Sequence, residues 1–265
     1  MTETDRRGAL RAGAGLAVAG ALTTGTLTAG CSALKAAPAD HRAAPATRHP
    51  AARTPRAAPA PRHVPGLPDQ IAHSPRGRPQ VALTFHGQGD QATARSILAI
   101  AEKADARITV LAVGSWLDEH PDLARRILDG GHDLGNHTHH HVTINELPEA
   151  DAYAEITGCA DRLRRLTGSI GTWFRPSRAD RATPLVARLA RRAGYPHVLS
   201  YDVDSLDFTS PGAGAVTRKI TSEVRAGSVV SLHFGYADTV AALPAVLEEL
   251  DRRNLRAVTT TELLT

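Results

Sequence analysis

Aromatic residues are scarce in this sequence, where phenylalanine, tryptophan and tyrosine together make up 4% of 265 residues. A hydrophobic core must therefore be built mainly from alanine, valine, leucine and isoleucine. No stretch interleaves aromatic residues with lysine and arginine, as a platform for stacking bases would, so we expect no nucleic-acid partner. The formal net charge of +4 reflects the arginines of residues 1–80 rather than a basic face on the folded part.

Cysteines and long apolar runs are also few. The two cysteines, Cys31 and Cys159, lie in contexts too different for a disulfide framework. Cys159 falls in an expected helix, where it is most simply a small buried hydrophobic residue. Residues 12–29 are only weakly apolar and hold too few bulky side chains for a membrane span. They follow Arg6-Arg7 and end in small residues, which is the pattern of a signal peptide over residues 1–30.

The segment after the signal peptide predicts how the protein is held at the cell envelope. Leu27 to Cys31 resembles the lipobox of bacterial lipoproteins, so a lipid on Cys31 would be the only membrane contact. Residues 31–78 are rich in alanine, proline, arginine and histidine and have few branched apolar residues, so we expect a disordered tether. We expect an exported, tethered or secreted protein, monomeric, with one folded domain at residues 79–265.

The folded part alternates short β-rich runs with amphipathic helical runs. The expected strands are 81–85, 108–113, 133–135, 172–175, 198–203, 229–233 and 256–259. The expected helices are 91–104, 123–128, 149–166, 184–193, 215–225 and 239–253. This alternation predicts an α/β fold with a parallel sheet, and about seven such units favour a distorted (β/α)7-type barrel over a flat sheet.

Polar residues end five of these strands. In parallel α/β folds the carboxyl ends of the strands carry the functional groups, so residues from separate strands converge there. The set comprises His86, His137 to His141, Arg175, Asp202 with Asp204, and His233. His137 and His141 stand four apart, and on one helical turn both would face a shared cation. A histidine-rich surface turn that binds metal only adventitiously is the alternative interpretation of this tract.

Together, these segments resemble the polysaccharide deacetylases, the NodB-homology members of carbohydrate esterase family 4, over nearly all of residues 79–265. Leu134-Gly135-Asn136-His137-Thr138 with His141 looks like the family's metal motif, preceded by Gly131 to Asn136 in the usual pattern. Further similar motifs are Phe174-Arg175-Pro176, Tyr201 to Phe208, Ser231-Leu232-His233, Gly227 to Val230 and Val258 to Leu264. The resemblance implies a distorted barrel whose divalent-metal site removes acetyl groups from N-acetylated glycans.

Deacetylation needs an activated water, oxyanion donors and an acid for the leaving amine. In this scheme His137 and His141 are metal ligands and His233 is the acid, its ring held by Asp204. Arg175 orients the base or binds substrate; a buried ion pair with Asp202 or Asp207 is the alternative.

The first motif departs from the family. Where the family has Thr-Phe-Asp-Asp-Gly, with a base and a third metal ligand, this chain has Thr84-Phe85-His86-Gly87-Gln88-Gly89-Asp90. His86 could complete a three-histidine zinc site. Alternatively, His86 is the base and Asp90 bends back to the metal. A third possibility is a site that binds glycan without cleaving it. Pro176-Ser177-Arg178 also lacks the family's aromatic residue, which places a cation near the substrate path.

We therefore predict a metal-dependent hydrolase, with zinc as the expected ion, that removes N-acetyl groups from an amino-sugar polymer such as peptidoglycan or a chitin-like glycan. The alternative is a catalytically inactive envelope lipoprotein that binds glycan or metal through the same site.

Overall fold

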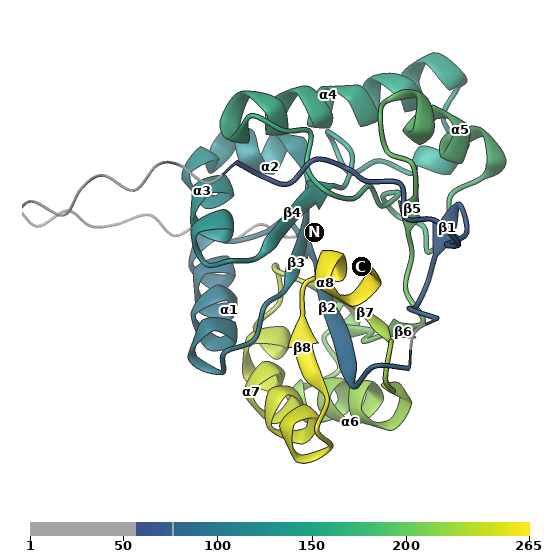
Figure 1. Ribbon diagram of the computed structural model, residues 1–265. Coiled ribbons are helices and arrows are strands. Elements are labelled where there is room, and N and C mark those ends of the chain that lie inside the picture. The colour runs from purple at the N-terminus through teal and green to yellow at the C-terminus, as the bar shows by residue number, and fades with distance from the viewer. Residues whose placement is uncertain (1–56, 76) are drawn as a thin grey trace, which may run out of the picture. The chain divides into compact units, whose positions relative to one another are not determined.

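The computed structural model describes residues 57–75 and 77–265 (Figure 1). The expected signal peptide, Cys31 and the first part of the expected tether lie outside these residues. Within the described ranges, none of the helices has both the length and the apolar character needed to cross a bilayer.

Parallel strands form the centre of the domain and confirm the predicted α/β fold. The larger sheet has the order β4 (Asp133–Asn136), β3 (Thr109–Ala112), β2 (Gln80–Gly87), β7 (Val229–His233) and β6 (Val203–Asp204), and β8 (Arg256–Val258) pairs with the amino end of β2. A separate pair consists of β1 (Gln70–Ile71) and β5 (Val198–Leu199). Phe174 bridges Asn136 of β4 to Val198 of β5, so the strands continue around a distorted, open barrel.

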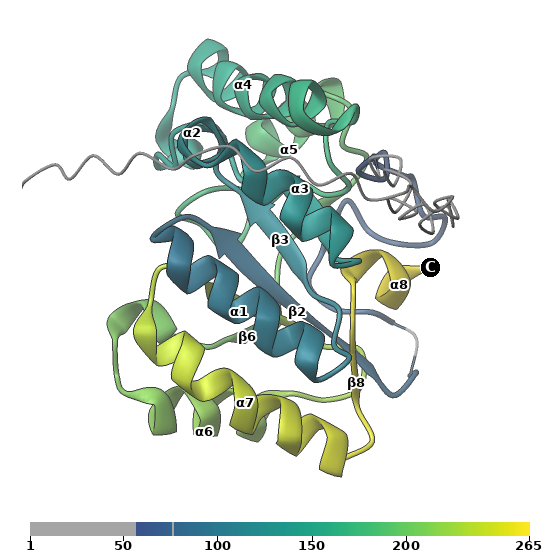
Figure 2. The same cartoon turned by 90° about the vertical axis from the view of Figure 1, so that its left-hand side faces the viewer.

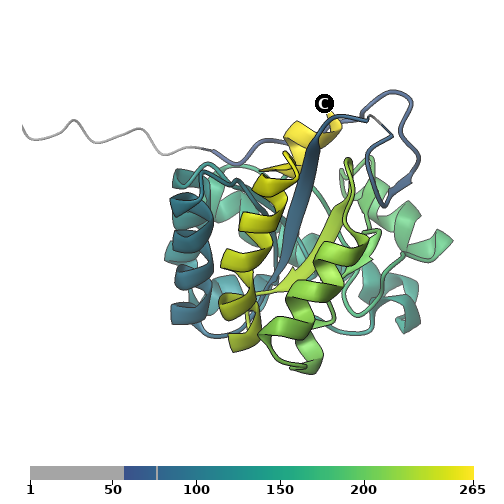
Figure 3. The ribbon, with the colours of Figure 1, turned by 90° about the horizontal axis from the view of Figure 1, so that it is seen from below.

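Six helices cover the outside of the strands (Figures 1 and 2). They are α1 (Gln91–Lys103), α3 (Pro121–Asp129), α4 (Glu149–Thr167), α5 (Pro184–Arg192), α6 (Ala213–Glu223) and α7 (Ala237–Arg252), each close to its predicted range. Local chemistry sets several ends: the Thr183 side chain caps α5 just before Pro184, and Gly168 ends α4 in the left-handed conformation. In the view from below, α6 and α7 lie side by side against the strands (Figure 3).

Side chains alternate across β2, and this alternation decides what reaches the interior. Val81, Leu83 and Phe85 belong to the core beneath the helices, whereas Ala82 belongs to the cluster inside the barrel. His86 therefore faces inward and Gly87 faces the helices. A Cβ on Gly87 would lie 2.9 Å from Cγ1 of Val110 and 3.0 Å from Cα of Ala112, so no side chain fits there without movement.

The amino end of the barrel is closed by α8 (Thr260–Leu264). The side chain of Thr109 accepts from the Thr260 amide at 2.8 Å, the Asp133 carboxylate accepts from the Thr261 amide at 3.0 Å, and Leu263 and Leu264 pack inside. Only the carboxyl ends of the strands are left to form a site. This short helix, α2 (Gly114–Glu119) and β1 were not predicted, because segments of two to six residues carry too little periodicity.

Two expectations about chain segments need correction. The expected strand 198–203 is divided into β5 and β6, and residues 172–175 contribute only the bridges at Phe174. Residues 57–74, expected to belong to a disordered tether, pack on the domain: Ala58, Val64 and Ile71 are buried and β1 pairs with β5. The branched apolar residues Val64, Leu67 and Ile71 of this segment belong to the cluster inside the barrel, which the overall composition did not indicate.

Candidate functional site

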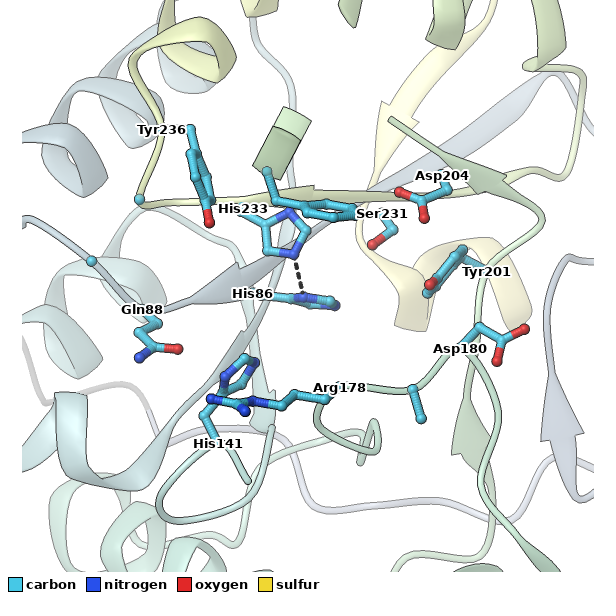
Figure 4. Close-up of a pocket in the computed structure, with 14 residues that line it drawn as sticks. His86, Gln88, His141, Arg178, Asp180, Tyr201, Asp204, Ser231, His233 and Tyr236 are labelled. Carbon is cyan, nitrogen blue, oxygen red and sulfur yellow. Dashed lines mark hydrogen bonds between the residues drawn. The ribbon is translucent and has the colours of Figure 1, made fainter. Parts of the chain in front are cut away.

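A cavity of about 750 Å³ opens at the carboxyl ends of β2, β6 and β7 (Figure 4). Four predicted site residues line it: His86, His141, Asp204 and His233. Arg175 and His137 are fully buried and contact this set from behind. The structure therefore brings these predicted residues together at one edge of the sheet.

Hydrogen bonds join Arg175, His86, His233 and Asp207 into a continuous row. Nη1 of Arg175 lies 3.2 Å from Nε2 of His86, Nδ1 of His86 lies 2.8 Å from Nε2 of His233, and Nδ1 of His233 lies 2.6 Å from the Asp207 carboxylate. A guanidinium can only donate, so Nε2 of His86 accepts and its Nδ1 carries the proton. His86 then donates to His233, and His233 donates to Asp207.

This arrangement uses both ring nitrogens of His86 and both of His233. Burial, followed by the neighbouring His137, His233 and Arg175, lowers the pKa of His86 well below its ordinary value, which keeps the ring neutral. A neutral ring with both nitrogens bonded cannot take a proton from water or ligate a metal until one of these bonds breaks.

The carboxylate that holds His233 is Asp207 rather than the predicted Asp204. Asp207 is fully buried and also accepts from the His233 amide and from the Thr239 hydroxyl. Asp204 lines the cavity, and its carboxylate accepts from the Leu206 amide at 3.1 Å. Because Asp207 lies in the 3-10 helix η2 (Asp207–Thr209) beyond the strand, strand periodicity could not indicate its direction.

Arg175 is held without a carboxylate partner. Its guanidinium donates to the carbonyls of Leu199 and Ser200, to the hydroxyl of Thr84 and to His86. Within the described residues Arg175 forms no ion pair with Asp202 or Asp207, and Asp202 pairs with Arg225 instead. Burial lowers the pKa of Arg175 to about 10, so the group remains a cation and a donor at neutral pH.

His137 and His141 approach each other through a loop rather than a helical turn. The chain from residue 137 to 141 is not helical, and Thr138 and His141 have φ values of 69° and 56°. The ring centroids still lie 5.0 Å apart. Nδ1 of His137 donates to the Arg175 carbonyl, which leaves Nε2 as a buried lone pair without a hydrogen-bond partner. Burial lowers the pKa of His141 to about 4, with Arg178 as the next cause.

The donor set falls short of the divalent-metal site that the family resemblance implies. His137 and His141 offer nitrogens, but His86 is committed to Arg175 and His233, and Gly87 has no side chain. Asp90 lies outside the cavity, where its carboxylate caps α1 by accepting from the Thr93 amide at 2.8 Å. Within residues 57–75 and 77–265, no three histidine, cysteine, aspartate or glutamate side chains are grouped to hold a metal ion.

Two aromatic residues that line the cavity were not among the predicted site residues. Phe208, which is 44% exposed, and Tyr236 flank His233, with ring centroids 5.4 and 5.8 Å from the imidazole. Tyr201, Gln88 and Arg178 complete the polar parts of the wall. Aromatic rings beside polar groups are typical of sites that bind sugars or other small ligands. Phe208, directly after Asp207, was the sequence feature that could have indicated an aromatic ring at this site.

Solved structures share this fold. The pseudoenzyme BA3943 of carbohydrate esterase family 4 from Bacillus anthracis superimposes with a TM-score of 0.71 at 22% identity, covering 75% of this chain and 70% of that chain. The Bc1960 peptidoglycan N-acetylglucosamine deacetylase gives a TM-score of 0.70 at 22% identity, covering 74% and 92%. The chain thus has the NodB-type fold of this carbohydrate esterase class.

Sequence comparison identifies related proteins. The polysaccharide deacetylase family profile matches residues 73–198. A peptidoglycan-N-acetylglucosamine deacetylase of Bacillus cereus is 28% identical over 194 residues, which are 72% of this chain and 90% of that protein. The deacetylase PgdA of Listeria monocytogenes is 26% identical over 69% of this chain and 38% of its own length. Residues 73–198 therefore match a polysaccharide deacetylase domain.

Proposed function

We propose that this protein binds an N-acetylated amino-sugar polymer of the peptidoglycan type in the cavity at the carboxyl ends of β2, β6 and β7. The observation that carries the proposal is the cavity itself, which combines the exposed ring of Phe208 and the half-buried ring of Tyr236 with hydrogen-bonding side chains. Sugar rings pack their C–H faces on aromatic rings and bond polar groups through their hydroxyls. The relatives named as peptidoglycan-N-acetylglucosamine deacetylases support the choice of glycan.

Binding without rapid hydrolysis fits the hydrogen-bonded row better than catalysis does. A general base needs a free lone pair, and an acid needs a proton directed at the substrate. In the row from Arg175 to Asp207, the lone pairs of His86 and His233 both accept hydrogen bonds, and their protons point along the row. The family fold is also found in a named pseudoenzyme, BA3943, so a binding member is compatible with this architecture.

Calorimetry with a tetramer of N-acetylglucosamine tests the proposal. We expect Phe208→Ala and Tyr236→Ala each to weaken binding about 10-fold, because each removes a ring from the cavity wall. Tyr153→Ala is the matched control. Tyr153 lies on α4, its ring stacks under the Arg192 guanidinium of α5, and it does not line the cavity. If the wild-type chain binds neither the tetramer nor purified peptidoglycan, the proposal is wrong.

A second candidate function is metal-dependent removal of the N-acetyl groups, with zinc as the expected ion. One observation favours it: Nε2 of His137 is a buried lone pair without a partner, next to His141. It requires a further donor that the described side chains do not present in this arrangement.

Metal content and acetate release decide between the two functions. The full chain is purified, exposed to Zn²⁺, and assayed for bound metal and for acetate released from the tetramer, beside His137→Ala. About one zinc per chain that depends on His137, together with released acetate, would establish the hydrolase. Glycan binding without bound zinc and without released acetate would support the binding function and exclude the hydrolase.

We also propose that the protein works at the cell envelope, where peptidoglycan lies, as an exported lipoprotein. The support is the sequence pattern before Cys31 and the named substrate of the relatives. Mass spectrometry of the mature amino terminus tests this proposal: a diacylated Cys31 is the expected finding, and an unmodified or uncleaved terminus would contradict it.

A further inference from the structure

The cavity holds one cation whose charge no described neighbour neutralises. Arg178 lines the wall beside His141, and its side chain has no hydrogen bond or ion pair among residues 57–75 and 77–265. Figure 4 shows its guanidinium against the His141 ring, on the side of the cavity away from Asp180 and Asp204.

The fold fixes the backbone from which Arg178 extends. Its φ is 54°, a left-handed conformation that a non-glycine residue keeps only when its surroundings impose it. The preceding Ser177 is fully buried, and its hydroxyl donates a hydrogen bond to the Val142 carbonyl. Earlier in the loop, the Arg175 guanidinium donates to the carbonyls of Leu199 and Ser200. The backbone that leads into Arg178 is therefore held, and from it the exposed Arg178 side chain lines the wall of the cavity.

An uncompensated guanidinium in a cleft is a site for an anion. Its planar donors match the two oxygens of a carboxylate, and charge-assisted bonds of this kind are stronger than neutral ones. A neutral acetamido group gains little from a full positive charge. The side chain that occupies the position of the family's aromatic residue is thus suited to an acidic group elsewhere on the glycan.

Resting on the proposed function, we infer that Arg178 binds a carboxylate carried by the glycan, so that the ligand is an N-acetylated polymer that contains an acidic sugar. A lactyl ether on every second residue supplies such a group without changing the N-acetyl substituents. Arg178 is then the residue that selects acidic over neutral glycans.

The test compares two ligands that differ only in charge. One is a tetrasaccharide of alternating N-acetylglucosamine and N-acetylmuramic acid with free lactyl carboxylates, and the other has these carboxylates converted to primary amides. Binding to the full chain is measured by calorimetry at low salt. We expect the wild type to bind the acid about 10-fold more tightly than the amide, and Arg178→Ala to reduce this ratio to about 1.

Arg181→Ala is the matched control. Arg181 is an exposed arginine in the same loop that does not line the cavity, so its removal changes the net charge equally and should keep the 10-fold ratio. Equal binding of acid and amide by the wild type, or an unchanged ratio in Arg178→Ala, would overturn this inference while leaving the proposed function intact. Failure to bind either ligand would overturn both.

Discussion

At the scale of the residue, His86 differs from the family's aspartate in more than charge. A carboxylate only accepts hydrogen bonds, whereas a neutral imidazole accepts on one nitrogen and donates on the other. The Arg175 guanidinium donates a hydrogen bond to Nε2 of His86. Nδ1 of His86 therefore carries the proton and donates a hydrogen bond to Nε2 of His233 at 2.8 Å. Histidine in place of aspartate thus turns the expected general base into a middle member of the hydrogen-bonded row from Arg175 to Asp207.

The row predicts the tautomer of His86. We expect the Nδ1–H form, because the Arg175 guanidinium can only donate to Nε2. We also expect the ring to stay neutral at about pH 6.5, where an ordinary imidazole is half protonated, because burial lowers the pKa of His86 well below that value. Nitrogen-15 NMR of selectively labelled histidine checks both points, with His86→Gln to assign the signal. A protonated Nε2 in the neutral ring would contradict the hydrogen-bond row.

At the scale of the element, β2 determines whether the missing metal ligand can simply be replaced. Gly87 lies on the helix-facing side of the strand, and a Cβ there would meet Val110 and Ala112. We expect Gly87→Asp to lower the free energy of unfolding by roughly 1–3 kcal/mol and not to raise zinc content, because the new carboxylate crowds a core instead of reaching the cavity. Urea unfolding and metal analysis measure the two effects.

Gly77→Asp is the control for this substitution, since a Cβ on Gly77 meets nothing within 4 Å. A Gly87→Asp variant as stable as the control, with one bound zinc per chain, would show that the end of β2 can turn its side chain inward.

His132, between α3 and β4, makes the stability of the fold depend on pH. Its Nδ1 accepts from the Ile108 amide at 3.2 Å, and burial lowers its pKa to about 4 despite the nearby Glu102. Between about pH 4 and 6.5 the ring binds more protons in the unfolded chain than in the folded one, so the free energy of unfolding rises with pH in this window. Above it, the contribution of His132 to stability is fully present.

We expect His132→Gln to reduce the slope of unfolding free energy against pH by up to about 1.4 kcal/mol per pH unit within this window. Urea unfolding from pH 4 to 8 measures the slope, and His63→Gln, at an exposed position, should leave it unchanged. An unchanged slope in His132→Gln would mean that the buried ring does not titrate as described.

The elements themselves were largely predictable, because β-then-α alternation and caps such as Thr183 are local signals. The parallel order of the strands then brought His86, His137, His141, Arg175 and His233 to one edge, as predicted. The choice of Asp207 over Asp204 was not predictable, because it depends on the turn after β6 and on a fully buried carboxylate. Asp90 illustrates the converse, since a carboxylate just before a helix is more readily a cap than a ligand.

At the scale of the whole molecule, the boundary of the folded domain lies well before residue 79. Ile71 is fully buried in β1, the Val64 amide donates to Nε2 of His197 at 3.0 Å, and the Pro59 carbonyl accepts from the hydroxyls of Ser169 and Thr172. This segment supplies β1, which pairs with β5, a strand that the larger sheet does not include.

Two fragments test this boundary. We expect a fragment of residues 79–265 to be less stable than one of residues 57–265 by roughly 3 kcal/mol or more, because it exposes the surface that Val64 and Ile71 cover and leaves the edge of β5 unpaired. Urea unfolding compares the two, and Ile71→Ala in the longer fragment should account for about 2–4 kcal/mol alone. Equal unfolding midpoints would mean that residues 57–78 contribute nothing to the fold, which would restore the tether boundary predicted from composition.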